Sequence, residues 1–224
     1  MTSFKVQDSL AEQIAQYLSQ RIFTSELESG ERIQEMRVAN ELNVSRGSVR
    51  EAFLLLQQRH LIDIIPRKGA VVAELPPKLI HDLFDMHEMI LIQSISWLCH
   101  SGRDDDIQPL FQLLEIMEGY ITANQVPHFY AALVNFSELS VQAVNNYYLT
   151  SSLENLLPVI QRALHQIALL SPSDMSELYR CLKRTLSSVN ERHSDAAEQH
   201  IVAYNRHLQQ VIAVAIRDRS LEPG

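Results

Sequence analysis

A polar cluster stands directly before an apolar helical segment in the first quarter of the 224-residue chain. It contains two hydroxyls and two guanidinium groups, on Ser45, Arg46, Ser48 and Arg50, with Gly47 between them. Arg46 and Arg50 are one helical turn apart, so they share a face. A guanidinium can form two parallel hydrogen bonds with guanine, and hydroxyls at a helix N-terminus suit a phosphate. The cluster therefore indicates contact with nucleic acid, and Gly47 would let the backbone come close.

The segments around this cluster predict how it is held. Two short helices joined by a three-residue turn and followed by a β-hairpin are the plan of a winged helix-turn-helix, whose second helix enters the major groove by its N-terminus. Arg37 and the hairpin tip at Lys68 and Gly69 are further candidates for contacts with the DNA backbone. The expected helices are 8–24, 34–42 and 46–58, the last capped by Ser45, and the expected strands are 61–65 and 70–74.

Taken singly, arginine and serine at the start of a helix are also common as a solvated cap. The order of helices, turn and hairpin favours double-stranded DNA as the partner over that alternative.

The segment "QEMRVANELNVSRGSVREAFLLLQQRHLIDIIPRKGAVV" closely resembles the winged helix-turn-helix of GntR-family bacterial repressors. It departs from the family pattern at Asn43, at Gly47-Ser48 and at His60. The resemblance implies that operator DNA is contacted by Arg37, Ser45, Arg46, Ser48, Arg50 and the Lys68-Gly69 tip. The matching positions are Ala39, Leu42, Val44, Ser45, Arg46, Val49, Arg50, Glu51, Ala52, Leu56, Leu61, Ile62, Gly69 and Val72.

A pair of prolines in "ELPPKL" marks a linker, after which only helical patterns occur. The fold class expected is mostly α, with an N-terminal winged helix-turn-helix over 1–75 and a C-terminal all-α helical bundle over 79–220. The helices expected after the linker are 77–100, 104–123, 127–145, 149–170, 174–192 and 194–216.

Charge separates the two parts of the chain, whose net charge is −8. Residues 1–76 carry 9 Lys/Arg and 10 Asp/Glu, whereas residues 77–224 carry 10 and 17. The acidic second part would keep off DNA and confine DNA affinity to the first part.

Several classes of protein are disfavoured. Phosphate-binding loops and hydrolase or metalloprotease motifs are missing, so we expect neither an enzyme nor a cofactor. His81, Asp82, Asp85 and His87 cluster at helical spacing, but such a group after a linker is usually a solvated first turn. No apolar run reaches 18 residues and no secretory signal is seen, so we expect a cytoplasmic protein without a membrane span.

The segment "NFSELSVQAVNNYYL" resembles the FCD-type effector domain found in the FadR-like GntR subgroup. The resemblance implies an effector site, and in many members an Asp and three His bind a divalent metal that holds a carboxylate effector. Here those positions fall on Leu133, Ser137, near Leu182 and near Tyr204, and leucines cannot ligate a metal. The family's Arg and Glu on the first effector helix fall on His87 and Leu91.

No metal is therefore expected, and the former metal cavity would be lined by Leu91, Leu133, Ser137, Leu182 and Tyr204. Such a lining suits a small, largely apolar effector that modulates DNA affinity. Two alternatives stay open. One is a metal-dependent sensor of a carboxylate metabolite, built from His207 and His165, and the other is a filled core with no effector. The expected function is a homodimeric transcriptional regulator that reads a palindrome, and the filled-core alternative would be an effector-independent DNA-binding protein.

Overall fold

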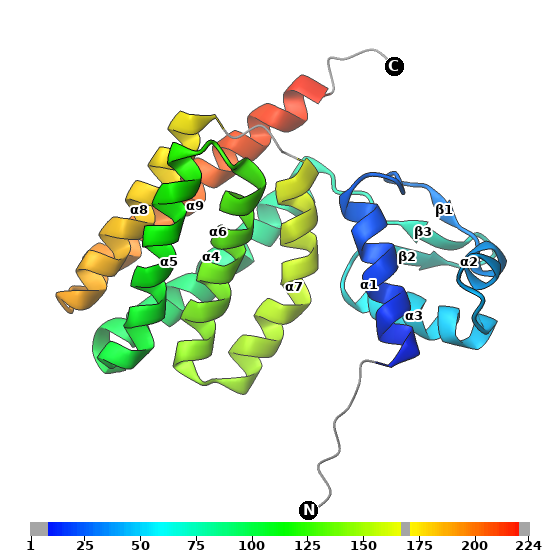
Figure 1. The fold of residues 1–224 in the computed structure, drawn as a ribbon, viewed down its shortest axis with the longest axis horizontal. Helices are drawn as coiled ribbons and strands as arrows, with labels where there is room; N and C mark the ends of the chain where they lie inside the picture. Colours follow the sequence, from blue (N-terminus) through cyan, green and yellow to red (C-terminus); the bar gives the residue numbers. More distant parts are fainter. Residues whose placement is uncertain (1–8, 167–170, 220–224) are drawn as a thin grey trace, which may run out of the picture. The chain divides into compact units, whose positions relative to one another are not determined.

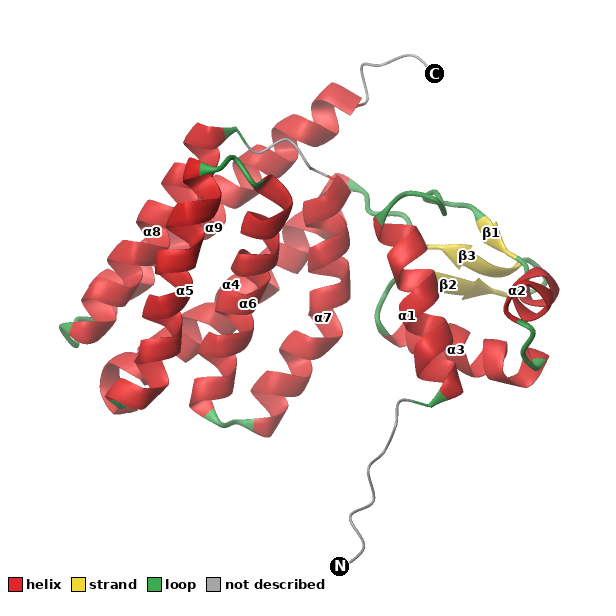
Figure 2. Ribbon diagram, viewed as in Figure 1, coloured by secondary structure: helices red, strands yellow, loops and turns green. Residues whose placement is uncertain are grey.

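The computed structural model describes residues 9–166 and 171–219, and this part of the chain is mostly helical (Figure 2). Contacts between Cα atoms divide the chain into two compact units, Met1–Leu75 and Pro76–Gly224. Each unit has its own secondary-structure pattern. The mostly α fold class predicted from the sequence is confirmed. The first unit combines helices with the strands, and the described part of the second unit contains helices only.

The first unit is a winged helix-turn-helix, as predicted (Figure 1). Its helices begin and end within two residues of the predicted bounds. The elements, in chain order, are α1 (Leu10–Phe23), β1 (Arg32–Ile33), α2 (Glu35–Leu42), α3 (Arg46–Gln58), β2 (Ile62–Ile65) and β3 (Gly69–Val72).

Two left-handed residues shape the turns on either side of α3. Asn43 ends α2 with φ 53°, and His60 follows α3 with φ 54°. The GntR pattern expects glycine at both positions, because glycine adopts positive φ without strain. Asn enters this region more readily than most other residues, so Asn43 preserves the turn that a glycine would make.

The core of the first unit forms where the apolar faces of α1 and α3 meet the sheet. Each helix repeats apolar residues three or four positions apart, so one stripe faces inward. The most deeply buried members of this core, each no more than 2% exposed, include Ile14, Ala15, Leu18, Ile22, Val49, Ala52, Leu56, Leu61, Ile62 and Val72.

The sheet has three antiparallel strands in the order β1-β3-β2. Strand β1 was not predicted, since the sequence around Gly30 indicated only a turn. The turn exists, but the Gly30 N–H donates to the Val72 carbonyl at 2.9 Å, and Arg32 then pairs with Val71. A strand of two residues is too short to show an alternating pattern, so only its pairing with β3 reveals it.

The second unit is all helical in its described residues, as predicted. Helix α4 begins with Pro77 at its first position, where the missing N–H costs nothing. The predicted extension of the fourth helix to residue 170 lies partly outside the described residues. The helices are α4 (Pro77–Ser101), α5 (Asp104–Thr122), α6 (Val126–Val144), α7 (Tyr147–Gln166), α8 (Pro172–Asn190) and α9 (Ser194–Arg219).

Helix α4 is central to this unit, because it contacts α6, α7, α8 and α9. Helix α8 runs along α9, and α5 packs against α6 and α8 (Figure 1). Across residues 9–166 and 171–219, no helix is long and apolar enough to cross a membrane.

Candidate functional sites

The N-terminus of α3 is built by a serine cap. The Ser45 hydroxyl accepts a hydrogen bond from the Ser48 N–H at 3.1 Å, and the two hydroxyls are 2.9 Å apart. Ser45 is extended, with φ −72° and ψ 148°, as an N-cap residue should be. The predicted cap is confirmed. It leaves the first turn of α3 exposed at Arg46 and Gly47.

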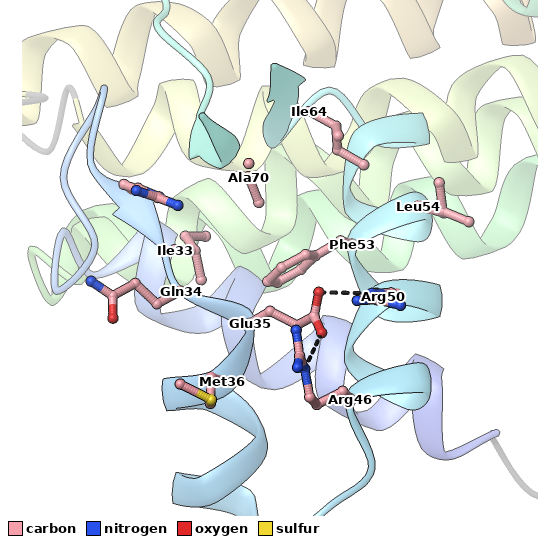
Figure 3. Close-up of a pocket in the computed structure, with 12 residues that line it drawn as sticks. Ile33, Gln34, Glu35, Met36, Arg46, Arg50, Phe53, Leu54, Ile64 and Ala70 are labelled. Atoms are coloured by element: carbon pink, nitrogen blue, oxygen red, sulfur yellow. Dashed lines mark hydrogen bonds and ion pairs between the residues drawn. The ribbon is translucent and has the colours of Figure 1, made fainter. Parts of the chain in front are cut away.

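Arg46 and Arg50 converge on one carboxylate, as Figure 3 shows. Arg46 Nε donates to Glu35 Oε1 at 2.6 Å, and Arg50 Nε donates to Glu35 Oε2 at 2.8 Å. Glu35 is the first residue of α2, so these two ion pairs join the two helices of the motif. The arginine side chains are 58% and 64% exposed, whereas Glu35 is only 21% exposed.

The electrostatics of Glu35 follow from this arrangement. The hydrogen bond from Arg50, together with the hydrogen bond and charge of Arg46, lowers the pKa of Glu35 despite its partial burial. The carboxylate therefore stays charged to a lower pH than an ordinary glutamate does. The sequence did not predict these pairs, because Glu35 and its partners lie on different helices and helical periodicity says nothing about contacts across a turn.

These three charged residues line a hollow of about 780 Å³ between α3 and the wing (Figure 3). Its wall also includes apolar side chains from α3 and the sheet, among them Phe53 and Ile64. Of the eight residues predicted to contact DNA, only Arg46, Arg50 and Gly69 are in this wall. The others lie outside it.

The wing tip is a tight turn between β2 and β3. The Lys68 N–H donates to the Ile65 carbonyl at 3.1 Å, and Arg67 and Lys68 are exposed. Arg67 and Gly69 have φ values of 67° and 86°. Gly69 is therefore required by the backbone, since a residue with a Cβ would be strained there.

Arg32 is an arginine that sequence reasoning missed. It lies on β1, it is exposed, and it lines the same hollow as Arg46 and Arg50. Its guanidinium nitrogens lie 3.8 and 3.9 Å from the point where a Cβ on Gly69 would stand. The pairing of β1 with β3 brings Arg32 to the wing. Recognition of β1 in the sequence would have been enough to place this arginine there.

The remaining two predicted contacts differ in their surroundings. Arg37 is exposed on α2, and its charge contributes to a lowered pKa of Glu41, after the larger effect of a hydrogen bond from Tyr17. Gly47 is not required by the protein itself. A Cβ there would be 3.6 Å from the Ser45 hydroxyl, which is an ordinary contact.

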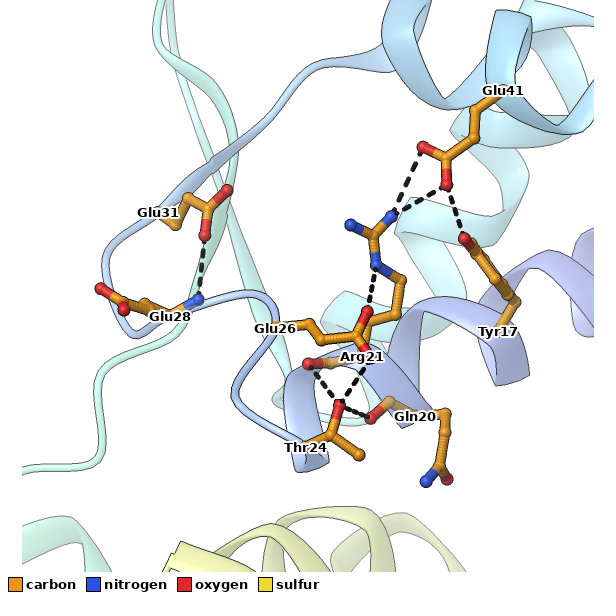
Figure 4. A network of polar contacts seen from close by, with 8 residues as sticks. All are labelled: Tyr17, Gln20, Arg21, Thr24, Glu26, Glu28, Glu31 and Glu41. Atoms are coloured by element: carbon orange, nitrogen blue, oxygen red, sulfur yellow. Dashed lines mark hydrogen bonds and ion pairs between the residues drawn. The ribbon is translucent and has the colours of Figure 1, made fainter.

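A polar network fixes α2 against α1 (Figure 4). Glu41 accepts hydrogen bonds from the Tyr17 hydroxyl at 2.5 Å and from Arg21 Nη1 at 3.2 Å. Arg21 Nε is also 3.2 Å from Glu26. The helix that carries Glu35 and Arg37 is thus anchored at its far end by α1.

In the helical unit, the five residues predicted to line an effector site are all buried, with exposures of 0–2%. They come from α4, α6, α8 and α9. Helix α4 contacts each of the other three helices. They are Leu91, Leu133, Ser137, Leu182 and Tyr204.

His87 is the functional candidate that the sequence reading placed wrongly. It was grouped with the solvated first turn of α4, but it is 2% exposed, whereas the His81 side chain is 62% exposed. Its Nε2 lies 2.9 Å from Ser137 Oγ, and the same hydroxyl lies 3.2 Å from the Leu133 carbonyl. A hydroxyl that donates to a carbonyl must accept from the imidazole, so Nε2 carries the proton.

The other nitrogen of this ring is left with an unused lone pair. His87 Nδ1 is buried and has no hydrogen-bond partner among the described residues. Burial lowers the pKa of His87 to about 4, so the ring is neutral at neutral pH. A helical wheel could have found this residue, because His87 lies on the same face of α4 as Leu83, Ile90 and Leu91.

Sequence-family comparison covers both units. Residues 10–72 match the model described as bacterial regulatory proteins of the gntR family, and residues 82–210 match the FCD domain. The chain belongs to the GntR family, in the group with an FCD domain. It is a DNA-binding regulator of transcription and not an enzyme.

Relatives agree with this GntR/FCD assignment, and a solved structure shares the fold. The chain is 29% identical over 175 residues to the gluconate operon transcriptional repressor of Bacillus licheniformis, covering 78% of this chain and 70% of that protein. It is 26% identical over 201 residues to the HTH-type transcriptional repressor RspR of Escherichia coli K12, covering 89% and 86%. The fold matches that of E. coli McbR/YncC with a TM-score of 0.74 at 18% identity, covering 95% and 100%.

The metal site known in many FCD domains does not fit these residues. The ligand positions that the resemblance identifies hold Leu133 and Ser137 and lie near Leu182 and Tyr204, and the Ser137 hydroxyl is engaged by His87. Over the described residues, no three His, Cys, Asp or Glu side chains are grouped so as to hold a metal. His207 Nε2 instead lies 3.2 Å from Asp174, and His165 Nδ1 lies 2.9 Å from a carbonyl of its own helix.

Proposed function

We propose that this GntR/FCD regulator binds a palindromic operator as a homodimer, through the N-terminus of α3 and the wing. The observation that carries the proposal is the pair of exposed guanidinium groups on the first turns of α3, beside the wing. The proposed contacts to DNA are Arg37, Ser45, Arg46, Gly47, Ser48, Arg50, Lys68 and Gly69.

Arg46 and Arg50 would read bases, while the hydroxyls and Lys68 would hold phosphates. Each bidentate contact with guanine is worth about 1–3 kcal/mol of discrimination, which corresponds to a factor of roughly 5 to 150 in affinity. The proposed DNA-binding domain, residues 1–75, would supply these contacts, and the proposed effector-binding and dimerisation domain, residues 79–220, would hold the dimer and any effector site.

An exposed apolar stripe on α4 supports dimerisation through the helical unit. Leu79, Met86 and Met89 are 51%, 43% and 63% exposed, and their spacing places them on one face. Exposed apolar side chains that are grouped in this way mark surfaces for association. Native mass spectrometry should give twice the 25.6 kDa mass of the chain, and a monomer at micromolar concentration would contradict the dimer.

We further propose that the helical unit takes a small, largely apolar effector between α4, α6, α8 and α9. The buried apolar side chains Leu91, Leu133 and Leu182 support this, with Ser137 and Tyr204 as polar partners. The open lone pair on His87 Nδ1 would accept a hydrogen bond from such a ligand. Binding would shift DNA affinity only if the two dimer states differ in ligand affinity.

Repression and a cytoplasmic location are also proposed. The relatives from B. licheniformis and E. coli are named as repressors, and a regulator of this family acts where the chromosome lies.

The first experiment tests the DNA contacts. A random duplex pool is selected with the wild-type protein, and dissociation constants are measured for the selected duplex. Arg46→Ala and Arg50→Ala should each weaken binding by about ten-fold or more. Arg184→Ala, an exposed arginine on α8, is the control and should leave binding unchanged. Wild-type affinity in both α3 variants would refute the assignment.

The second experiment tests the effector site. Protein purified without chelator is examined by native mass spectrometry together with metal analysis. A co-purified organic molecule that is lost in the Tyr204→Phe variant would support the apolar effector. A stoichiometric metal would favour the metal-dependent alternative, and a dimer carrying neither ligand nor metal, with operator affinity unaffected by metabolites, would favour an effector-independent regulator.

A further inference from the structure

Glu35 is placed to control how the two recognition arginines present themselves. Each of its carboxylate oxygens takes the Nε–H of one arginine, at 2.6 and 2.8 Å (Figure 3). The terminal Nη groups of Arg46 and Arg50 make no hydrogen bond to any described residue. Both guanidinium groups are therefore held at one edge and open at the other.

Holding Nε restricts the geometry of base recognition. A guanidinium can meet guanine either by its side edge, with Nε and one Nη, or by its end, with both Nη groups. When Nε is bonded to Glu35, only the end remains. The same bond limits rotation of the guanidinium, so less side-chain freedom is lost when DNA binds.

The exposure of the three side chains argues against a purely structural role. Both arginines are more than half exposed, and ion pairs exposed in this way contribute little to folding stability. One carboxylate between two cations does reduce their mutual repulsion, which lets them stand side by side. Its own charge also repels phosphates, which disfavours binding to duplexes that give the arginines no guanine.

We propose that Glu35 is a positioning residue that determines specificity, holding Arg46 and Arg50 by Nε so that each presents its paired Nη groups to a base. This inference rests on the proposed recognition role of the two arginines. It predicts opposite effects on specific and non-specific binding when Glu35 is changed, because orientation matters only for the first and charge matters for both.

The test uses Glu35→Gln in the full-length protein, with Glu51→Gln as the matched control. Gln cannot reproduce this arrangement, because the two arginines use separate carboxylate oxygens and one of these is replaced by an NH2 group that only donates. Glu51 is an exposed carboxylate on α3 that makes no hydrogen bond or ion pair with another described residue. Dissociation constants are measured for the duplex selected by the wild type and for a scrambled duplex of equal length.

Glu35→Gln should weaken binding to the selected duplex by about ten-fold, the effect of losing roughly one good base contact. It should at the same time strengthen binding to the scrambled duplex, because a negative charge has been removed. Glu51→Gln should strengthen both slightly and leave their ratio unchanged. If Glu35→Gln behaves like this control, Glu35 acts only through its charge and the proposal is wrong.

Two further variants separate the possible failures. Glu35→Asp keeps the charge but shortens the reach, so it should weaken binding to the selected duplex without strengthening binding to the scrambled one. In an Arg46→Ala/Arg50→Ala background, Glu35→Gln should no longer change the ratio. A persistent effect there would overturn the positioning role. Retained operator affinity in the double arginine variant alone would instead refute the proposed recognition residues.

Discussion

His87 and Ser137 are hydrogen-bonded inside the helical unit, with Nε2 of the imidazole 2.9 Å from the hydroxyl oxygen, and both side chains are 2% exposed. The bond joins α4 to α6 at Ser137, the position that the resemblance to FCD domains assigns to a metal ligand. A neutral imidazole suits this place, because an uncompensated charge would be costly to bury.

The first prediction concerns acid stability. The pKa of His87 is about 4 in the folded protein and near 6.5 when unfolded, so the unfolded chain binds a proton first as pH falls. The stability that this residue contributes is present above pH 6.5 and is lost between pH 6.5 and pH 4. His87→Gln, which does not titrate, should lack this loss. The free energy of unfolding, measured with urea at several pH values, should therefore fall by about 3 kcal/mol more in the wild type than in His87→Gln as the pH is lowered. Parallel curves for the two proteins would show that His87 is not held neutral.

The second prediction concerns the cap of α3. Ser45→Ala removes the acceptor for the Ser48 N–H and should destabilise the first unit by about 1 kcal/mol. Ser45→Asp restores the cap but places a negative charge where a phosphate is expected. Thermal unfolding should therefore recover in the Asp variant while DNA affinity does not. Full recovery of both would remove Ser45 from the proposed phosphate contacts.

Two glycines should respond to alanine in opposite ways. Gly69 has φ 86°, so Gly69→Ala should cost about 1–2 kcal/mol of folding stability through backbone strain. Gly47 lies within α3 with room for a Cβ, so Gly47→Ala should stabilise the fold by roughly 0.5 kcal/mol. Calorimetry tests both changes. If Gly47→Ala still weakens DNA binding, the backbone at position 47 must approach the DNA closely, and unchanged binding would argue against that approach.

The wing should contribute charge rather than sequence recognition. Lys68→Ala should weaken binding to every duplex and reduce the slope of log affinity against log salt by about one unit. Lys78, whose side chain is 82% exposed at the start of α4, provides the control and should leave the slope unchanged when replaced by alanine. Equal slopes for wild type and Lys68→Ala would take the wing tip out of the DNA contacts.

Most of the secondary structure could be predicted because its signals are local. The cap at Ser45, the left-handed turn at Asn43 and the helical repeat of apolar residues all act within a few positions. The same holds for the turn between β2 and β3. These local signals, taken in order, were enough to recognise the winged helix-turn-helix.

The features that escaped prediction all depend on contacts between elements. Strand β1 exists only through its pairing with β3, and Arg32 reaches the hollow only through that pairing. Glu35 meets Arg46 and Arg50 across the turn between α2 and α3. His87 was misplaced because its charged neighbours in sequence outweighed the apolar face on which it lies.

The shared carboxylate of Glu35 has a consequence for how such a protein can evolve. Replacing one arginine leaves Glu35 paired with the other, so this first step preserves an ion pair in which the two charges cancel. Replacing Glu35 first leaves two like charges without their common partner. Substitutions at these three positions should therefore not be additive, and the order in which they arise should decide which lineages can acquire a new operator preference.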